Sequence, residues 1–195
     1  MTITKANRNI SDLQATGQVA CKLFLEECKK QGLNVLVTET LRTQERQNYL
    51  YCQGRTVSEC TKKGIPSDFA KKYCNPNANQ VTWTLDSNHK NGLAWDICKN
   101  IKGQEYNDSS FFSKAGKIAK ELGIEWGGTW EESDTPHFQI SKGWKKPMAK
   151  VPEWQVESLK SVIKKLKLDP EYWTEDKLNN PITIGELMAL INKMV

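Results

Sequence analysis

The chain has 195 residues, enough for one ordinary domain and a small second one. Its hydrophobic share of 38% and its seven tryptophans provide for a buried core and exclude a wholly disordered chain. The net charge of +5 comes from scattered lysines, without a basic run or a basic patch interleaved with aromatic residues, which excludes nucleic acid as the expected partner.

Compartment and redox state follow from what the sequence lacks. No stretch approaches the roughly 18 consecutive apolar residues of a membrane-spanning helix, so we expect no membrane insertion. Residues 1–8 lack the apolar run of a secretory signal, and we expect a protein made in the cytoplasm. Without a secretory signal, we expect the cysteines to be reduced, and most of them to be small buried apolar residues: Cys21, Cys28, Cys52, Cys60, Cys74 and Cys98. Because none of them forms a Cys-x-x-Cys pair, we expect neither a thiolate zinc cluster nor a thioredoxin-like site.

The first third of the chain predicts a helix, a strand and a second helix. The first helix begins at Ser11, a good N-cap residue, and ends at Gly32. Residues 33–39 alternate as a half-buried strand does, and residues 44–51 are helical in pattern. The apolar residues of the first helix recur at helical spacing, mostly on one face: Leu13, Val19, Ala20, Leu23, Phe24 and Cys28.

Residues 53–80 are rich in glycine, proline and asparagine, which predicts a long loop. Such a loop often forms a lid or a binding wall, and a solvated surface excursion is an equally good interpretation. Residues 81–84 predict a short strand. Residues 93–98 predict another, apolar except for Asp96, whose carboxylate must be paired or metal-bound because an isolated buried charge is costly.

An amphipathic helix is predicted over residues 111–122. After it, Trp126 and Trp130 flank two glycines, a combination that either shapes a pocket or forms a turn with core tryptophans. Residues 137–140 predict a strand with His137 and Gln139 on one face.

The composition changes after residue 142, where the chain becomes rich in lysine, glycine and proline without periodicity. We therefore predict a domain of residues 1–143, a linker of residues 144–152 and a small helical module of residues 153–195. Within the module, Thr183 and Glu186 have the form of a capping box before a helix.

The chain has only two histidines, and each lies near an aspartate: His89 precedes Asp96, and Asp134 precedes His137. Two neutral imidazoles and a carboxylate suit a divalent transition metal, and three protein ligands with one open position are typical of a catalytic site. Asp134 is then the carboxylate that takes the proton of the attacking water and passes it to the leaving amine. The alternative is a hydrogen-bonded cluster of His and Asp side chains.

These residues form two motifs, Ser87-x-His89-x-x-Gly92-x-Ala94-x-Asp96 and Asp134-x-Pro136-His137. Together they resemble the paired signature of the VanY-like zinc D-Ala-D-Ala carboxypeptidase and L-alanyl-D-glutamate endopeptidase family. The resemblance extends to residues 39–47, 53–56 and 126–130 and covers about residues 10–140. Within the family, the chain is most similar to bacteriophage endolysins of the L-alanyl-D-glutamate peptidase type.

The resemblance implies an α+β fold, a small antiparallel sheet flanked by helices as in hedgehog domains and D-Ala-D-Ala peptidases. It implies one catalytic Zn²⁺ held by His89, Asp96 and His137, with Asp134 as general base and acid. Where many relatives carry a glutamate, this chain has Asp134, whose shorter side chain requires a closer approach to the water.

The resemblance also implies residues that act on the substrate. Arg42 matches an arginine directed at the substrate carbonyl or its developing oxyanion, with a structural salt bridge as the alternative. We further expect Ser87, Trp126 and Trp130 to contact the substrate. Gln139 stands where some relatives carry a histidine, and we do not count it as a ligand.

The leading hypothesis is a bacteriolytic endolysin that hydrolyses the L-Ala-D-Glu bond of the peptidoglycan stem peptide. The missing secretory signal fits an enzyme that stays in the host cytoplasm until it is released to the cell wall. The alternatives are a D-Ala-D-Ala carboxypeptidase of the same family and a non-catalytic, zinc-containing wall-binding module. For residues 153–195 we expect a role in wall binding or self-association.

Overall fold

The structure, a computed structural model, describes residues 3–147, 153–174 and 183–192. The chain divides into two compact units, residues 1–146 and 147–195. Most of the predicted linker of residues 144–152 lies outside the described residues, so the domain boundaries stay a prediction. Among the helices that the structure describes, none is both long and apolar enough to cross a membrane.

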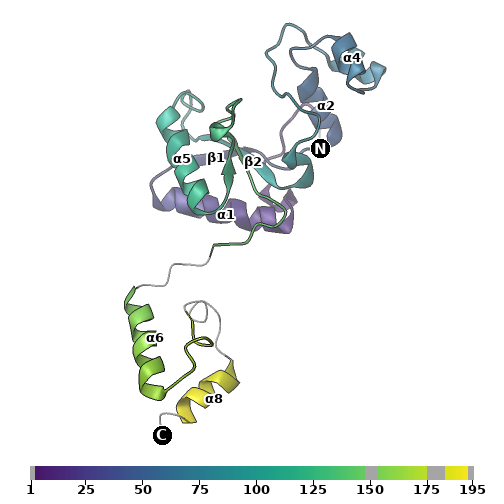
Figure 1. The fold of residues 1–195 in the computed structure, drawn as a ribbon. Coiled ribbons are helices and arrows are strands. Elements are labelled where there is room, and N and C mark those ends of the chain that lie inside the picture. The colour runs from purple at the N-terminus through teal and green to yellow at the C-terminus, as the bar shows by residue number, and fades with distance from the viewer. Residues whose placement is uncertain (1–2, 148–152, 175–182, 193–195) are drawn as a thin grey trace. The chain divides into compact units, whose positions relative to one another are not determined.

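The first unit has a four-stranded sheet in which all pairs are antiparallel (Figure 1). The strands, in the spatial order β1-β2-β4-β3, are β1 (Val35–Glu39), β2 (Ala94–Lys99), β3 (Glu125–Trp126) and β4 (His137–Gln139). The helices are α1 (Ala15–Lys30), α2 (Gln44–Cys52), α3 (Val57–Lys62), α4 (Ser67–Tyr73) and α5 (Ser109–Glu121), with the 3-10 turns η1 (Ile10–Asp12), η2 (Asn88–Asn91) and η3 (Gly127–Thr129). The predicted α+β class, with a small antiparallel sheet flanked by helices, is confirmed.

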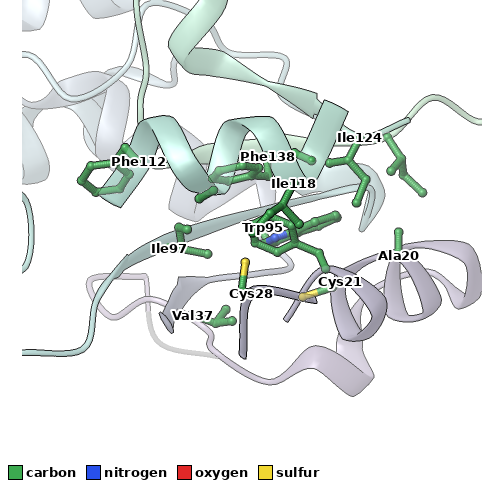
Figure 2. Close-up of a cluster of buried hydrophobic side chains, with 14 of the residues drawn as sticks. Ala20, Cys21, Cys28, Val37, Trp95, Ile97, Phe112, Ile118, Ile124 and Phe138 are labelled. Carbon is green, nitrogen blue, oxygen red and sulfur yellow. The ribbon is translucent and has the colours of Figure 1, made fainter. Parts of the chain in front are cut away.

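The main core lies where α1, α5 and one face of the sheet meet (Figure 2). At its centre the Phe24 ring packs against Trp95 and Phe138, with ring centroids 6.0 and 4.7 Å away. Because side chains alternate along β2, the burial of Trp95 and Ile97 in this core turns Asp96 toward the opposite face. The core thereby fixes which face of the sheet carries the polar residues.

The first helix differs from the prediction at its start. Ser11 lies within the turn η1, where its hydroxyl donates to Asn9 Oδ1 at 2.9 Å, and α1 begins only at Ala15. Val19, predicted to face the core, is 48% exposed, while Cys21 is fully buried. The other predicted core residues that are buried are Leu13, Ala20, Phe24 and Cys28, so the predicted apolar face is largely confirmed.

The predicted loop of residues 53–80 contains the helices α3 and α4, which pack with α2 around a second, smaller core apart from α1 and α5 (Figure 1). The capping box that starts α3 joins Thr56 and Glu59. Residues 81–84 form no strand, since the Thr84 carbonyl accepts from the Gln47 side chain at 2.7 Å instead of from a neighbouring strand.

The second unit holds α6 (Glu153–Leu166) and α8 (Ile184–Asn192). The capping box predicted at the start of α8 is confirmed: the Thr183 N–H donates to Glu186 Oε2 at 2.7 Å, and the Glu186 N–H donates to Thr183 Oγ1 at 3.2 Å. A role of this unit in wall binding or self-association stays a prediction.

Candidate active site

Strand pairing places three polar residues side by side on the sheet. Asp96 of β2 lies opposite both Glu39 of β1 and His137 of β4. The register of β1 shifts between Val37 and Glu39, where a bulge adds one residue. Without the bulge, Thr38 would pair with Asp96 and Glu39 would turn to the core face, because a slip of one residue reverses every side chain. The bulge therefore brings a second carboxylate beside Asp96.

His89 reaches this row from the turn η2. The Ser87 Oγ accepts from the His89 N–H at 3.4 Å, and Gly92 ends the turn with a φ of 65°. A Cβ on Gly92 would lie 2.6 Å from Gln14 N, and a Cβ on Gly17 of α1 would lie 2.3 Å from the Gly92 carbonyl oxygen. The two glycines thus allow α1 to pack directly against the turn that carries His89.

The three predicted metal ligands direct one atom each toward a common point. His89 Nε2 lies 3.1 Å from Asp96 Oδ1 and 3.2 Å from His137 Nδ1, and the last two atoms are 3.2 Å apart. Ligand atoms placed 2.0–2.1 Å from a tetrahedral ion are about 3.3 Å from one another. The side chains therefore have the spacing of three ligands of one metal ion.

The outer nitrogens of both imidazoles contact oxygen acceptors. His89 Nδ1 lies 2.7 Å from the Thr40 carbonyl oxygen, and His137 Nε2 lies 3.1 Å from Gln139 Oε1. Because these oxygens can only accept, each neutral ring carries its proton on the outer nitrogen. Two imidazole lone pairs and a carboxylate oxygen then face one another, an arrangement that needs a cation or an added proton between them. The donor set fits a metal ion.

Gln139 is the partner of His137 that the sequence analysis did not assign. Its Nε2 donates to Glu125 Oε2 at 2.8 Å, and its Oε1 accepts from Asn88 Nδ2 at 2.9 Å, which fixes the orientation of the amide. The same Oε1 is therefore presented to the outer nitrogen of His137. The sequence analysis predicted His137 and Gln139 on one face of a strand, and this placement could have indicated their contact.

Burial and neighbouring charges shift the acidity of the cluster. Burial disfavours the Asp96 carboxylate, but His89 and His137 more than offset it and hold the pKa of Asp96 well below its usual range. For His137, burial acts to lower the pKa, but the hydrogen bond and negative charge of Asp96 outweigh burial, so the pKa of His137 is raised overall. Burial, followed by the negative charge of Asp96, raises the pKa of Asp134. A carboxyl group with this property can both accept and return a proton.

A cleft of about 910 Å³ is lined by His89, Asp96 and His137, and also by four further residues predicted for the site: Arg42, Ser87, Trp130 and Asp134. The Trp130 ring centroid lies 5.0 Å from that of His137. Seven of the eight residues that the sequence analysis assigned to the site therefore meet in one cleft.

Trp126 is the exception, since it is not among the described residues that line this cleft. Its Nε1 donates to the Thr135 carbonyl at 2.8 Å, and its ring stacks on that of Phe138 with the ring centroids 6.5 Å apart. A Cβ on Gly116 or Gly128 would lie 2.2 or 2.1 Å from the indole. The glycines accommodate a ring that packs against the main core, and the predicted contact of Trp126 with the substrate stays a prediction.

Arg42 is 8% exposed and held from two sides. Its Nη1 donates to Gln47 at 2.8 Å, and its Nη2 donates to Glu39 at 2.7 Å and lies 3.5 Å from Asp96 Oδ2. Glu39 also accepts from Arg46 Nε at 2.9 Å. Arg42 thus forms a structural salt bridge, which was the alternative to a role at the substrate, and it also lines the cleft. Glu39 and Gln47, which hold its guanidinium in place, were not assigned to the site by the sequence analysis.

A tight turn sets Asp134 beside His137. The Asp134 N–H donates to the Gly127 carbonyl at 2.9 Å, and the His137 N–H donates to the Asp134 carbonyl at 3.1 Å. A Cβ on Gly127 would lie 2.6 Å from the Asp134 carbonyl oxygen and 3.1 Å from His137 Cβ. Glycine at this position is therefore required for the turn to close against η3.

Sequence comparisons point to the same segment. Residues 80–140 match the family model described as D-alanyl-D-alanine carboxypeptidase. The chain is 34% identical over 122 residues to the peptidoglycan L-alanyl-D-glutamate endopeptidase CwlK of Bacillus subtilis, covering 56% of this chain and 62% of the relative. It is 30% identical over 138 residues to the L-alanyl-D-glutamate peptidase of Listeria phage A118, covering 68% of this chain and 40% of the relative.

The chain thus spans less than two thirds of the length of either relative. Among solved structures, the Serratia marcescens L-Ala D-Glu endopeptidase ChiX has a TM-score of 0.44 and 21% identity, covering 72% of this chain and 89% of that one. The family match contains all three candidate metal ligands and Asp134. Residues 80–140, which carry the predicted motifs, are thus similar to the D-alanyl-D-alanine carboxypeptidase family, and the chain is similar to two L-alanyl-D-glutamate peptidases, as its sequence predicts.

Proposed function

We propose that this protein is a zinc peptidase that hydrolyses the L-Ala-D-Glu bond of the peptidoglycan stem peptide and thereby lyses bacterial cell walls. The observation that carries the proposal is the convergence of His89 Nε2, Asp96 Oδ1 and His137 Nδ1 in a cleft that also holds Asp134 and Arg42. Two curated relatives bear the name of an L-alanyl-D-glutamate peptidase, which favours this bond over D-Ala-D-Ala.

Two nitrogen ligands and one carboxylate oxygen suit zinc, with a fourth position left for water or substrate. Zinc, when bound there, supplies Lewis acidity toward the scissile carbonyl and makes water acidic enough to ionise near neutral pH. His89 and His137 each present an unprotonated nitrogen because Thr40 and Gln139 hold the ring protons on the far side.

The remaining cleft residues divide the work of hydrolysis. Asp134 takes the proton of the attacking water and returns it to the leaving amine, which its raised pKa favours. Arg42, held by Glu39 and Gln47, is a fixed cation that stabilises negative charge on the substrate carbonyl oxygen. Arg8 also lines the cleft and suits a substrate with a carboxylate beside the scissile bond.

The cleaved bond is tested by mass spectrometry of purified peptidoglycan after digestion with the zinc-loaded protein. We expect stem peptides with a new amino terminus at D-Glu, and glycan strands that keep only L-Ala. A digest without metal is the control. Release of single D-Ala residues in place of these products would contradict the endopeptidase proposal and support carboxypeptidase action.

The contact between Gln139 and His137 gives a second test of the metal site. We expect Gln139→Leu to weaken zinc binding about 10- to 100-fold, because His137 loses the acceptor that sets its tautomer and orientation. Competition with a chromophoric chelator measures the affinity. Gln104→Leu is the matched control, since Gln104 contacts Lys99 outside the cleft. Equal zinc affinities for the two variants would contradict this role of Gln139.

A further inference from the structure

A second group of metal-ligating side chains lies outside the cleft. Cys52 is the last residue of α2, Cys60 lies in α3 and Cys74 follows α4, and their three Sγ atoms all lie within 4.8 Å of one another. Cys52 and Cys60 are fully buried, and Cys74 is partly exposed. None of the three lines the cleft, so the cluster is separate from the candidate active site.

We propose that Cys52, Cys60 and Cys74 bind a thiophilic divalent cation such as Zn²⁺ as three thiolates, with water as the fourth ligand. The cation replaces one proton on each thiol, so that three sulfur–metal bonds form and three protons are released. The charge of the bound site is then −1. Sulfur ligands 2.3 Å from a tetrahedral ion are about 3.8 Å apart, a separation that fits within the span of the three Sγ atoms.

Arg55 provides an independent indication that negative charge belongs here. Arg55 is 7% exposed, and its guanidinium lies 3.9 Å from the centroid of the Tyr51 ring. The guanidinium donates to the Tyr51 carbonyl at 2.7 Å and to Gln80 Oε1 at 3.4 Å. Within the described part of the chain, no carboxylate oxygen lies within 4.0 Å of it. The charge of Glu59 acts on Arg55 only from beyond this distance. A buried cation is stabilised by a nearby negative charge, which a metal–tris-thiolate group at Cys60 and its two neighbours would supply.

The surroundings of the thiols favour metal binding over redox chemistry. Cys52 lies at the carbonyl end of α2, which attracts cations and disfavours a bare thiolate. Burial raises the pKa of Cys60 to about 11, with Arg55 opposing it only in part, and burial raises the pKa of Cys52 as well. Without a metal the thiols stay protonated and weakly nucleophilic, whereas a soft cation can displace the protons.

The cluster also has a structural use. The core shared by α2, α3 and α4 contains five buried residues: Tyr51, Cys52, Cys60, Ile65 and Ala70. Two of these five are cysteines. A core this small gains rigidity from a metal ion or a disulfide. A bound ion would tie the end of α2 to α3 and α4, and so fix the start of residues 75–84, whose last four residues line the cleft.

Cobalt substitution of the 195-residue protein tests the proposal, because cobalt–thiolate bonds give near-ultraviolet charge-transfer absorption that the His and Asp ligands cannot give. We expect one equivalent of this absorption in the wild-type protein and none in Cys74→Ala. Cys74 is chosen because its partial exposure limits the packing loss. Cys98→Ala removes a buried thiol outside the cluster and should keep the full absorption.

Thiol labelling of the wild-type protein gives a second measurement that needs no variant to fold. We expect zinc to slow alkylation of Cys74 at least tenfold relative to protein treated with a chelator. Absence of cobalt–thiolate absorption from the wild-type protein, or equal absorption in Cys74→Ala, would overturn the proposal. So would a disulfide between two of the three cysteines in metal-free protein as isolated. Both measurements report on the thiols directly, so their result is read independently of hydrolysis in the cleft.

Discussion

Asp134→Asn is expected to lower the rate of stem-peptide hydrolysis about 10²- to 10⁴-fold, the usual contribution of a general base and acid. The amide keeps the shape of the side chain but cannot accept a proton from water. The substitution leaves the backbone hydrogen bonds of the turn in place. In these bonds the Asp134 N–H donates to the Gly127 carbonyl, and the His137 N–H donates to the Asp134 carbonyl. Initial rates on a soluble stem peptide, measured beside zinc content, check the prediction.

The zinc content of Asp134→Asn should match that of the wild-type protein, because Asp134 is outside the set of three converging ligand atoms. Asp86→Asn is the matched control: Asp86 is another carboxylate of the cleft lining, and it pairs with Lys90 at the surface. An Asp134→Asn protein with full activity would contradict the assigned role. Inactivity of both variants would point to a general loss of negative charge in the cleft.

Removal of the metal is expected to abolish hydrolysis, with a loss of more than about a thousandfold, since several kcal/mol of transition-state stabilisation disappear with the ion. Chelation should inactivate the wild-type protein, and added zinc should restore it. His89→Ala should be inactive and should not recover with zinc, because one of the three ligand atoms is lost. Hydrolysis rate and bound zinc are measured on the same samples.

Lys90→Ala is the control for His89→Ala, since Lys90 is the next residue of η2 and its Nζ contacts Asp86 and the Leu85 carbonyl. This variant should keep both zinc and activity. The far-ultraviolet circular dichroism of His89→Ala should stay close to that of the wild-type protein if loss of activity is due to loss of metal. Full hydrolysis by thoroughly chelated wild-type protein would refute the metallopeptidase proposal.

Secondary structure was predictable where a local pattern was long enough. The apolar period of α5 and the capping box of Thr183 and Glu186 depend only on neighbours in sequence, and both are confirmed. The helices α3 and α4 have six and seven residues, too few to show a period. Their Thr56–Glu59 capping box was a local signal within a segment whose glycine and proline content indicated a loop.

The candidate ligands were predictable because two histidines with nearby aspartates narrow the choice to a few side chains. The geometry of these ligands could not be predicted, because it depends on pairing between strands that lie far apart in the sequence. The bulge of β1 decides that Glu39, and not Thr38, lies beside Asp96. No pattern within residues 35–39 specifies a bulge, so the fixation of Arg42 by Glu39 followed only from the sheet.

For Trp126 and Trp130, too, the sequence indicated the residue types, and the fold decided which of them lines the cleft. The sequence places both beside two glycines, and either could pack or bind. In the fold, Gly116 of α5 and Gly128 leave space for Trp126 to pack against the core, while Trp130 lines the cleft near His137. Which indole lines the cleft therefore depends on a contact with α5, a helix that lies earlier in the chain.

By itself, the sequence determined the long helices, the chemical types at the candidate metal centre and the family resemblance, which in turn implied the α+β class. The reason is that these features are recorded in local patterns and motifs. The tertiary structure alone decided the register that aligns Glu39, Asp96 and His137, and the meeting of Cys52, Cys60 and Cys74. The physical reason is that both arrangements depend on contacts between distant segments, which packing of the whole chain determines.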